Sequence, residues 1–264
     1  MTEQAWFDIR DFAREIASRA GSELRSRFGR MHTVRTKSSD KDLVTEADLA
    51  SERLLLEAIR SRFPTHAILA EETQARTARD AEWLWMVDPL DGTTNYAHGF
   101  PVWCVSIGVQ HRGRMVAGVT YDPMRDEMFH AVSSGGAWLG EEPIRVSETD
   151  RLAKGLLATG FAYDAATNLD NNLPEFGRMI LRAQGVRRAG SAALDLAYVA
   201  AGRFDGYWEF RLSPWDWAAG SLLVQEAGGR LTDVRGGPWR TGVDSIVASN
   251  GRIHDELVQV LARR

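Results

Sequence analysis

The chain has 264 residues, of which 44% are hydrophobic and 26% are charged, as in an average globular protein. Its 36 acidic and 32 basic residues give a formal net charge of −4, which argues against a protein that coats nucleic acid. The start of the chain is charged and periodic, and the apolar run near WCVSIGV is far too short to span a bilayer. We therefore expect no secretory signal, no membrane contact and no direct nucleic-acid partner. A small anionic ligand, met by local donors or metal ions, is compatible with this charge.

Cysteine usage gives a prediction about the cellular compartment. Cys104 is the only cysteine of the sequence, so an intramolecular disulfide is impossible. A cytoplasmic setting is the simplest interpretation, because reducing compartments keep thiols free. Cys104 itself lies in an apolar stretch, and we expect it to be an inert core residue.

The first half of the chain predicts two helices followed by strands. Apolar residues recur at helical spacing from Trp6 to Leu24, and Gly29 is expected to end this long amphipathic helix. A second helix is expected from about Glu46 to Phe63, where Pro64 stops it. Strand-like segments follow at residues 67–71, 83–88, 102–110, 115–122, 127–132 and 136–140. The turn sequences HRGR, DPMRDE and SSGG between the later segments predict an antiparallel meander.

From about Leu152 the pattern changes to alternating strands and helices. Strands are expected at residues 156–161, 186–190, 205–210, 230–233 and 244–250. Helices are expected at residues 171–185, 191–202, 213–229 and 251–263. Such alternation is typical of layered sheets covered by helices, so we predict an α/β fold with an α+β first half and an α/β second half. We divide the chain into residues 1–150 and 151–264, as two parts of one continuous unit.

The stretch WLWMVDPLDGTTNYAHGF, residues 83–100, is the most informative one for chemistry. Asp88 ends an apolar strand, Pro89 interrupts the regular ladder, and Asp91 follows three residues after Asp88. Gly92 and Thr93 then open a helical turn, whose amides favour an anion such as phosphate. Hard oxygen ligands beside such amides are what a magnesium-dependent phosphate enzyme needs. A structural explanation stays open, in which Asp91 caps a helix and Asp88 lies in a polar turn.

A phospho-aspartate enzyme is the competing chemistry for this stretch. Such enzymes also place two aspartates at a strand end, but usually with one residue between them, so that both side chains lie on one side. Here Pro89 and Leu90 both intervene. This spacing counts against an aspartyl nucleophile and favours two metal ligands.

Three further acidic positions have a structural explanation as well as a functional one. Glu71 and Glu72 end the AILAEE strand, where only one of two neighbouring side chains can face a site. Asp48 completes a capping box with Thr45. Asp216 lies in the first turn of a helix that begins at SPWD, where the helix dipole stabilises an acidic side chain.

Four stretches of the sequence together resemble the inositol monophosphatase family. They are KSSDKDLVTEAD, MVDPLDGTTNYAHGFP, RRAGSAALDLAYVAAGRFDGYWE and PWDWAAGSLLVQEAGG, and they occur in the order of the family over essentially the whole chain. The resemblance implies a layered αβαβα sandwich of the sugar-phosphatase type. It also implies two or three Mg²⁺ ions, for which Mn²⁺ can substitute.

The resemblance implies a metal site built from acids that are distant in the sequence. The expected metal ligands are Glu71, Asp88, Asp91, Asp216 and the main-chain carbonyl of Leu90. Two carboxylates about 4 Å apart repel by roughly 4 kcal/mol at an effective dielectric constant near 20, so such a cluster calls for divalent cations. The expected catalytic residues are Asp48, Thr93 and Glu71. Asp48 can both cap its helix and orient Thr93 only if its second oxygen is free.

Substrate contacts are implied on two sides of this site. The expected substrate-binding residues are Gly92, Thr93, Thr94, Gly190, Ser191, Ala192, Glu209 and Asp216. For Ser191 a helix cap is an alternative role, and for Glu209 an ordinary edge-strand charge. Arg187, Arg188 and Arg211 lie near these motifs, and the sequence does not separate substrate contact from surface charge.

The function that the resemblance implies is hydrolysis of myo-inositol monophosphate by an activated water, without a phosphoenzyme. Histidinol phosphate or another sugar phosphate is the nearest alternative substrate. Fructose bisphosphate and nucleotide 3′-phosphates are less favoured, because relatives that use them often carry extra segments. A protein-binding regulator is the alternative from another class, since some bacterial relatives bind the transcription machinery. The resemblance further implies inhibition by lithium and a homodimer.

Overall fold

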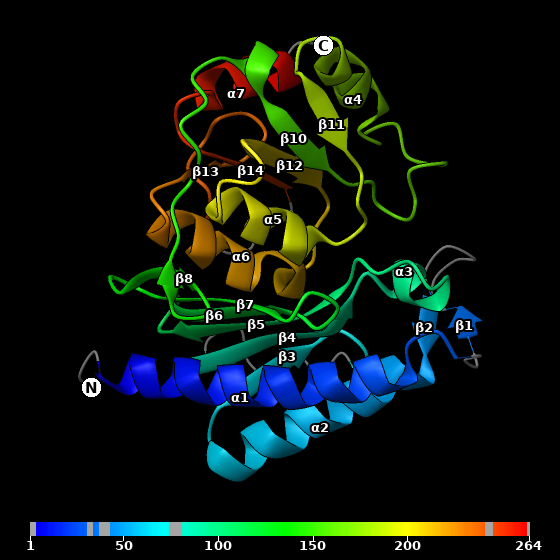
Figure 1. The fold of residues 1–264 in the computed structure, drawn as a ribbon, viewed down its shortest axis with the longest axis vertical. Coiled ribbons are helices and arrows are strands. Elements are labelled where there is room, and N and C mark those ends of the chain that lie inside the picture. Colours follow the sequence, from blue (N-terminus) through cyan, green and yellow to red (C-terminus); the bar gives the residue numbers. More distant parts are fainter. Residues whose placement is uncertain (1–3, 31–33, 37–42, 74–80, 241–244, 263–264) are drawn as a thin grey trace.

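The computed structural model describes residues 4–30, 34–36, 43–73, 81–240 and 245–262. Figure 1 shows these residues in five stacked layers, in the order helices, sheet, helices, sheet, helices. The α/β class and the αβαβα sandwich expected from the resemblance are therefore confirmed. No helix in the described ranges combines the length and the apolar character that crossing a bilayer requires.

The helices and strands have the following bounds. The helices are α1 (Gln4–Arg27), α2 (Glu46–Arg62), α3 (Thr93–Ala97), α4 (Leu173–Ile180), α5 (Ala192–Ala200), α6 (Pro214–Glu226) and α7 (His254–Ala262), with a 3₁₀ turn at Leu152–Lys154. The strands of the first half are β1 (Val34–Thr36), β2 (Leu43–Thr45), β3 (Ala67–Ala70), β4 (Trp83–Asp91), β5 (Cys104–His111), β6 (Arg114–Asp122), β7 (Glu127–Val132), β8 (Gly136–Leu139) and β9 (Glu142–Pro143). The strands of the second half are β10 (Leu156–Thr159), β11 (Gly185–Arg187), β12 (Gly206–Phe210), β13 (Arg230–Thr232) and β14 (Ser245–Ser249).

Helices α1 and α2 form the first layer, on one face of the larger sheet (Figure 1). The apolar positions predicted for α1 are buried, among them Ile9, Ile16 and Leu24. Helix α2 begins after Thr45, whose hydroxyl accepts the amide of Ala47 at 3.2 Å. It ends before Pro64, as the sequence predicted.

The larger sheet has seven strands in the order β3-β4-β5-β6-β7-β8-β9. Strand β3 is parallel to β4, and the remaining neighbours are antiparallel, which confirms the predicted meander. Strand β4 continues to Asp91 instead of ending at Asp88. Asp88 pairs with Ser106 and Asp91 with Cys104, so β4 carries one extra residue at this bulge. Pro89 lacks an amide hydrogen, which explains why the ladder is interrupted there.

Helices α5 and α6 form the central layer, between the two sheets (Figure 1). Small residues let α6 approach its neighbours closely. A Cβ on Gly108 of β5 would collide with Ala218, and one on Gly118 of β6 would lie 2.9 Å from the carbonyl oxygen of Ala219. The start of α6 therefore packs closely against β5 and β6.

The smaller sheet has the strand order β11-β10-β12-β14-β13, with β12 in its centre. Helices α4 and α7 cover its outer face (Figure 1). The helix predicted for residues 171–185 is shorter than expected, because α4 ends at Ile180. The amide of Gln184 then bonds to the carbonyl of Gly155 at 3.0 Å, which brings Gly185 into register with Leu156 of β10. The strand predicted at residues 186–190 accordingly lies at Gly185–Arg187.

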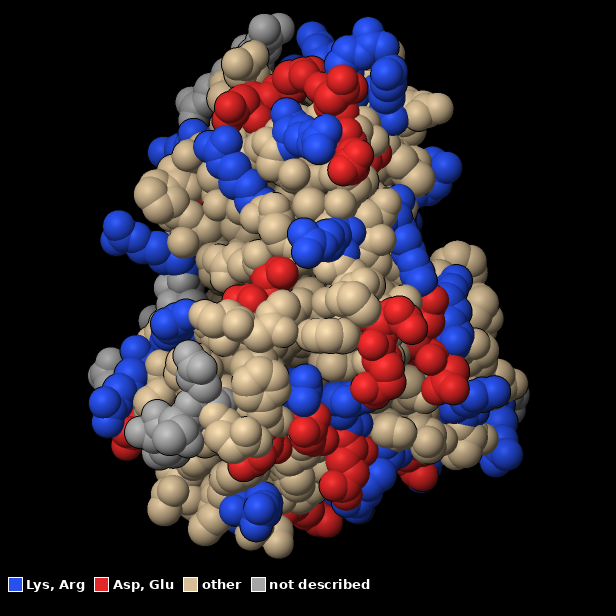
Figure 2. Space-filling model, turned by 60° about the vertical axis from the view of Figure 1, so that its left-hand side comes forward, with Lys and Arg blue, Asp and Glu red and all other residues tan. Residues whose placement is uncertain are grey.

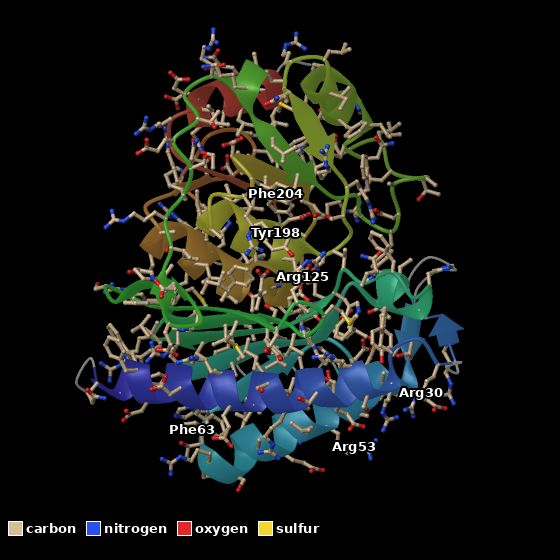
Figure 3. All side chains as sticks on the ribbon, viewed as in Figure 1. Arg30, Arg53, Phe63, Arg125, Tyr198 and Phe204 are labelled. Carbon is tan, nitrogen blue, oxygen red and sulfur yellow. The ribbon has the colours of Figure 1, made fainter. Side chains whose placement is uncertain are left out.

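Aromatic and ionic contacts join the central helices to the larger sheet. Tyr198 of α5 packs edge-on against Phe129 of β7, with ring centroids 6.0 Å apart, and against Phe204 at 5.6 Å. Arg203 donates two hydrogen bonds to Glu127, at 2.6 and 2.5 Å. Figure 3 shows Tyr198 and Phe204 above the larger sheet, in the region of the central helices. These contacts hold the two halves of the chain against each other.

Candidate active site

A cavity of about 440 Å³ lies between the two halves of the molecule. Its wall contains residues from the end of β4, from α3, from the segments after β3 and β10, from the start of α5 and from the segment between β12 and α6. Of the predicted site residues, the cavity is lined by Glu71, Asp88, Leu90, Asp91, Gly92, Thr93, Thr94, Gly190, Ser191, Ala192, Glu209 and Asp216. Asp48 lies behind this wall, where it contacts Thr93.

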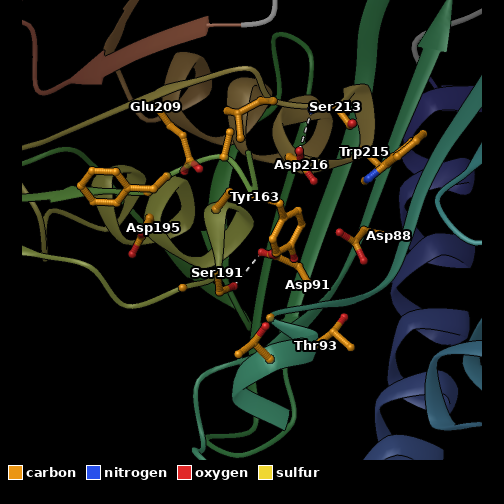
Figure 4. Close-up of a pocket in the computed structure, with 18 of the residues that line it drawn as sticks. Asp88, Asp91, Thr93, Tyr163, Ser191, Asp195, Glu209, Ser213, Trp215 and Asp216 are labelled. Carbon is orange, nitrogen blue, oxygen red and sulfur yellow. Dashed lines mark hydrogen bonds between the residues drawn. The ribbon is translucent and has the colours of Figure 1, made fainter. Parts of the chain in front are cut away.

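Four acidic side chains enter the cavity from three places in the fold. Asp88 and Asp91 flank the bulge of β4. Glu71 follows β3, and its amide bonds to the carbonyl of Val87 at 3.2 Å, which places it beside β4. Asp216 comes from the first turn of α6, where its Oδ2 accepts the amide of Ser213 at 2.7 Å. Figure 4 shows Asp88, Asp91 and Asp216 around the same space.

The acids of the cavity repel one another. Burial raises the pKa of Asp88 well above its ordinary value, and the charges of Glu71, Asp91 and Asp216 raise it further. Burial likewise raises the pKa of Asp91 to about 6, against hydrogen bonds that lower it. The pKa of Asp216 is raised by burial and then by Asp91 and Glu71. This concentration of negative charge costs free energy, which a bound cation would recover.

The donor set fits a hard divalent cation. It consists of carboxylates and the carbonyl of Leu90, the oxygen ligands that Mg²⁺ prefers. In their present orientation, no three acidic, histidine or cysteine side chains in the described residues converge closely enough to hold an ion. The carboxylates would therefore have to turn toward one another when a cation binds.

Asp48 and Thr93 form a buried hydrogen-bonded pair. Asp48 Oδ2 accepts the amide of Thr45 at 2.9 Å, which completes the predicted capping box. Its Oδ1 accepts the hydroxyl of Thr93 at 3.0 Å, and that hydroxyl also lies 3.1 Å from the carbonyl oxygen of Leu90. Asp48 is fully buried, and burial raises its pKa to about 6. The condition stated for Asp48 is met, because each of its oxygens serves a different partner.

Gly92 directs the chain from the bulge into α3. Its φ of 99° is in the left-handed region, and a Cβ there would lie 2.9 Å from the carbonyl oxygen of Val102. Glycine is therefore required at this position. Within the described part of the chain no side chain caps α3, so the amides of its first turn have no side-chain acceptor there, beside the cavity. This is the arrangement that binds an anion at a helix start.

Ser191 connects the two halves at Asp91. Its hydroxyl donates to Asp91 Oδ2 at 2.6 Å, and the amide of Ala193 donates to the same oxygen at 2.7 Å. The Ser191 oxygen also accepts the amide of Leu194 at 3.4 Å as the N-cap of α5. The cap and the site contact are therefore both present. Cys104 is buried, but its sulfur lies 3.8 Å from Asp91 Oδ2, a neighbourhood that sequence reasoning missed.

Glu209 lies on the central strand of the smaller sheet, so it is not an edge-strand charge. It lines the cavity and accepts a hydrogen bond from the hydroxyl of Tyr207. Burial raises the pKa of Glu209 to about 7, although the Tyr207 bond and the charge of Arg188 lower it. Gly160 makes room for this side chain, because a Cβ there would collide with the Glu209 carboxylate.

The structure also assigns the three arginines that the sequence left open. Arg188 and Arg211 line the cavity, whereas Arg187 is exposed and is not part of the wall. Arg211 forms an ion pair with Asp164 at 2.5 Å. Two arginines therefore line the same cavity as the acids of β4.

Some residues of the site were missed in the sequence. Asp195 is buried and lines the cavity, one helical turn beyond Ser191 on α5, a spacing that could have indicated it. Glu52 accepts the amides of Glu72 and Thr73 at 2.8 and 3.0 Å and so holds the turn that carries Glu71. It lies one turn after Asp48 on the same face of α2, which is the signal for it.

Asn95 ties α3 to the second half of the chain. Its side-chain amide donates to the carbonyl of Ala189 at 2.8 Å and to that of Val102 at 2.7 Å. No local pattern in the sequence predicts these contacts, because they join segments that meet only in the fold.

Acidic and basic side chains are interspersed in small groups on the face of the molecule shown in Figure 2. The coloured side chains on that face form no continuous basic stripe of the kind that follows a nucleic-acid backbone. The charge that distinguishes the site is therefore concentrated in the cavity.

Comparisons with known proteins agree with this geometry. The model of the inositol monophosphatase family matches residues 7–264. A Synechocystis protein named inositol-1-monophosphatase is 49% identical over 98% of this chain and 89% of its own length. A Pseudomonas aeruginosa protein named Nus factor SuhB is 44% identical over 93% of each chain. The solved inositol monophosphatase of Anabaena shares 48% identity and a TM-score of 0.88, over 96% of this chain and 95% of that one. The chain belongs to the inositol monophosphatase family and is a phosphoric monoester hydrolase of that type.

Proposed function

We propose that the protein hydrolyses myo-inositol monophosphate to inositol and phosphate, with Mg²⁺ as its cofactor. The observation that carries the proposal is that Glu71, Asp88, Asp91 and Asp216 line the same cavity as the first turn of α3, whose amides no side chain of the described residues caps. A phosphate group needs two kinds of partner: cations, which the carboxylates would hold, and amide groups that donate hydrogen bonds. The name and the 49% identity of the Synechocystis relative support inositol phosphate as the substrate.

The metal ligands that we propose are those four carboxylates and the carbonyl of Leu90. Bound Mg²⁺ would neutralise charge on the phosphate oxygens and make the attacking water more acidic. Two or three ions fit the number of carboxylates, and Mn²⁺ is expected to substitute because it prefers the same oxygen ligands. Asp216 also faces the substrate, at the start of α6.

The chain's own residues then orient and deprotonate the water. We propose that Thr93 holds the attacking water through its hydroxyl, which donates to Asp48 at 3.0 Å. As the water attacks phosphorus, its proton passes to the Thr93 oxygen while the Thr93 proton moves to Asp48. The raised pKa of Asp48, about 6, makes it a stronger base than an exposed aspartate. Glu71 acts beside them, as a metal ligand and as a second acceptor near the water.

Substrate binding is divided between the two halves of the cavity. The amides of Gly92, Thr93 and Thr94 hold the phosphate oxygens in this proposal. On the alcohol side, Gly190, Ser191 and Ala192 form the wall, and Glu209 accepts hydrogen bonds from ring hydroxyls. The carboxylate of Glu209 lines the cavity and is held by Tyr207, which supports this role.

Activity across a small panel of phosphate esters tests the proposal. With Mg²⁺, we expect myo-inositol 1-phosphate to have a higher kcat/KM than histidinol phosphate and glycerol 2-phosphate. Chelation of the metal should abolish turnover, and lithium should inhibit where sodium does not. If only histidinol phosphate were turned over efficiently, it would be the substrate in place of myo-inositol monophosphate. Turnover that survives chelation would refute the metal site.

A second role as a protein-binding factor is supported by the relative named Nus factor SuhB. An Asp88→Asn variant separates the two roles, because it removes a proposed metal ligand and leaves the outer surface unchanged. Specific capture of the same partner by the wild type and by this variant would support the second role. A homodimer remains a proposal from the resemblance, and light scattering of the purified protein tests it. A cytoplasmic location remains a proposal from the single cysteine.

A further inference from the structure

The segment from Thr159 to Asn172, between β10 and α4, forms part of the cavity wall that the roles above do not use. Phe161, Ala162 and Tyr163 all line the cavity. The segment lies beside Glu209, since a Cβ on Gly160 would collide with that carboxylate. Whatever occupies the alcohol side of the cavity therefore meets this segment.

A buried asparagine, Asn172, joins the two ends of the segment to each other and to β12, the strand of Glu209, by hydrogen bonds. The side-chain amide of Asn172 donates to Thr159 Oγ1 at 2.9 Å and to the carbonyl of Gly160 at 2.7 Å. Its carbonyl oxygen accepts the indole N–H of Trp208 at 2.7 Å, and Trp208 precedes Glu209 on β12. Asn172 is buried and has a φ of 68°, a left-handed conformation that costs free energy in a residue with a side chain. Its three hydrogen bonds maintain this conformation.

Two further contacts fix the middle of the segment. The ring of Phe161 packs edge-on against Phe176 of α4, with centroids 5.8 Å apart. Asp164 forms its 2.5 Å ion pair with Arg211, which follows β12 and also has a left-handed φ, 63°. Ala162 and Tyr163 lie between these two contacts and line the cavity, so the chain is held on both sides of them.

Tyr163 presents an aromatic ring to the alcohol side of the cavity. It lines the cavity and yet is 47% exposed, so it stands at the rim. Figure 4 shows Tyr163 in the middle of the labelled residues, with Glu209 to one side and Asp91 to the other. A flat apolar surface therefore stands next to a hydrogen-bonding carboxylate.

We propose that Tyr163 is a specificity-determining residue that selects cyclic polyol phosphates over acyclic ones. A cyclohexane polyol with mostly equatorial hydroxyls has ring faces of C–H bonds and an edge of hydroxyl groups. The Tyr163 ring packs against such a face, while Glu209 binds the hydroxyl edge. An acyclic alcohol such as glycerol has no face of this kind to bury. This inference rests on the proposed function, because it takes the alcohol side to be where the polyol binds.

The test compares Tyr163→Ala with Tyr163→Phe, with Leu169→Ala as the matched control. Leu169 lies in the same segment, is 94% exposed and is not part of the cavity wall. For myo-inositol 1-phosphate, Tyr163→Ala should raise KM about three- to tenfold, the loss expected for a small buried apolar area, with kcat retained. Its kcat/KM for glycerol 2-phosphate should stay unchanged. Tyr163→Phe and Leu169→Ala should behave like the wild type with both esters.

A binding measurement makes the test independent of turnover. In saturation-transfer NMR the aromatic protons of the protein are irradiated. Their saturation should pass to the C–H protons of added myo-inositol in the wild type and in Tyr163→Phe. The transfer should fall in Tyr163→Ala. Equal losses with both esters, a loss in Tyr163→Phe as large as in Tyr163→Ala, or unchanged transfer would each overturn the inference. If the wild type hydrolyses neither ester, the proposed function fails, and the transfer measurement still decides the role of Tyr163.

Discussion

The hydroxyl of Ser191 donates a 2.6 Å hydrogen bond to Asp91, so the cap of a helix in the second half orients a carboxylate of the first half. The amide of Ala193 binds the same carboxylate oxygen at 2.7 Å. Oδ2 of Asp91 thus accepts hydrogen bonds from two groups at the start of α5. A single residue therefore links the assembly of the two halves to the geometry of the proposed metal site.

Replacing Ser191 by alanine should weaken metal binding. Loss of a group that orients a metal ligand typically costs about 10- to 100-fold in metal affinity, so the Mg²⁺ concentration for half-maximal activity should rise by at least about tenfold. The lost helix cap should also lower the free energy of unfolding by about 1 kcal/mol. Ser191→Thr keeps the hydroxyl and is the control. Mg²⁺ titrations of activity give the first quantity and urea unfolding the second, and an unchanged Mg²⁺ requirement would contradict this role.

Replacing Thr93 by valine should impair the chemical step and leave the fold intact. Valine has nearly the same shape but cannot donate to Asp48 or hold a water. We expect kcat to fall by about 10²- to 10⁴-fold, the usual contribution of general acid–base catalysis, with little change in KM. Thr93→Ser should retain most of the activity. Steady-state kinetics measure both parameters, and an equal loss in the valine and serine variants would assign Thr93 a purely structural role.

Replacing Gly160 by alanine should displace Glu209. The added Cβ would occupy the position of the Glu209 carboxylate, which must then move within a buried strand. Misplacing a substrate-binding group by about 1 Å can cost up to about 100-fold in rate, so kcat/KM for myo-inositol 1-phosphate should fall by at least about tenfold. Gly177→Ala is the matched control, because an added Cβ on Gly177 meets no atom within 4 Å. If both variants kept full activity, Glu209 would not be held by this contact.

His254 should make the fold sensitive to acid. It is fully buried, with Ser249 Oγ 2.8 Å from Nδ1 and Thr232 Oγ1 2.9 Å from Nε2, and burial lowers its pKa to about 4. The unfolded chain takes up this proton near pH 6.5, whereas the fold takes it up only near pH 4. Stability is therefore lost as the pH falls through this window, by up to about 3 kcal/mol from this residue.

A His254→Gln variant isolates this effect from that of the cavity acids. The acids act in the opposite direction, because their raised pKa values make the fold bind protons before the unfolded chain does. The difference between wild type and variant removes their contribution. Urea unfolding from pH 7 to pH 4.5 should show a steeper loss of stability in the wild type, and parallel curves would contradict the prediction.

Much of the fold follows from local patterns in the sequence. The 3.6-residue periodicity of residues 6–24 and the stop at Pro64 give two helices, and apolar segments separated by turn sequences give the meander. The capping box of Thr45 and Asp48 is also local, since its partners are three residues apart. These features depend on hydrogen bonds and burial within a few residues, which a single segment already specifies.

The sequence alone therefore determined the helices and strands that build the layers, the interruption of the ladder at Pro89, and the residue types suited to metal and phosphate. Only the tertiary structure decided that Glu71 and Asp216 share one cavity with Asp88 and Asp91, and that Tyr163 stands at the rim of this cavity. It also decided that β12 is a central strand. The reason is physical: these positions depend on packing between segments far apart in the chain, such as α6 against the glycines of β5 and β6. No local propensity encodes such a contact, because it forms only when both partners are already folded.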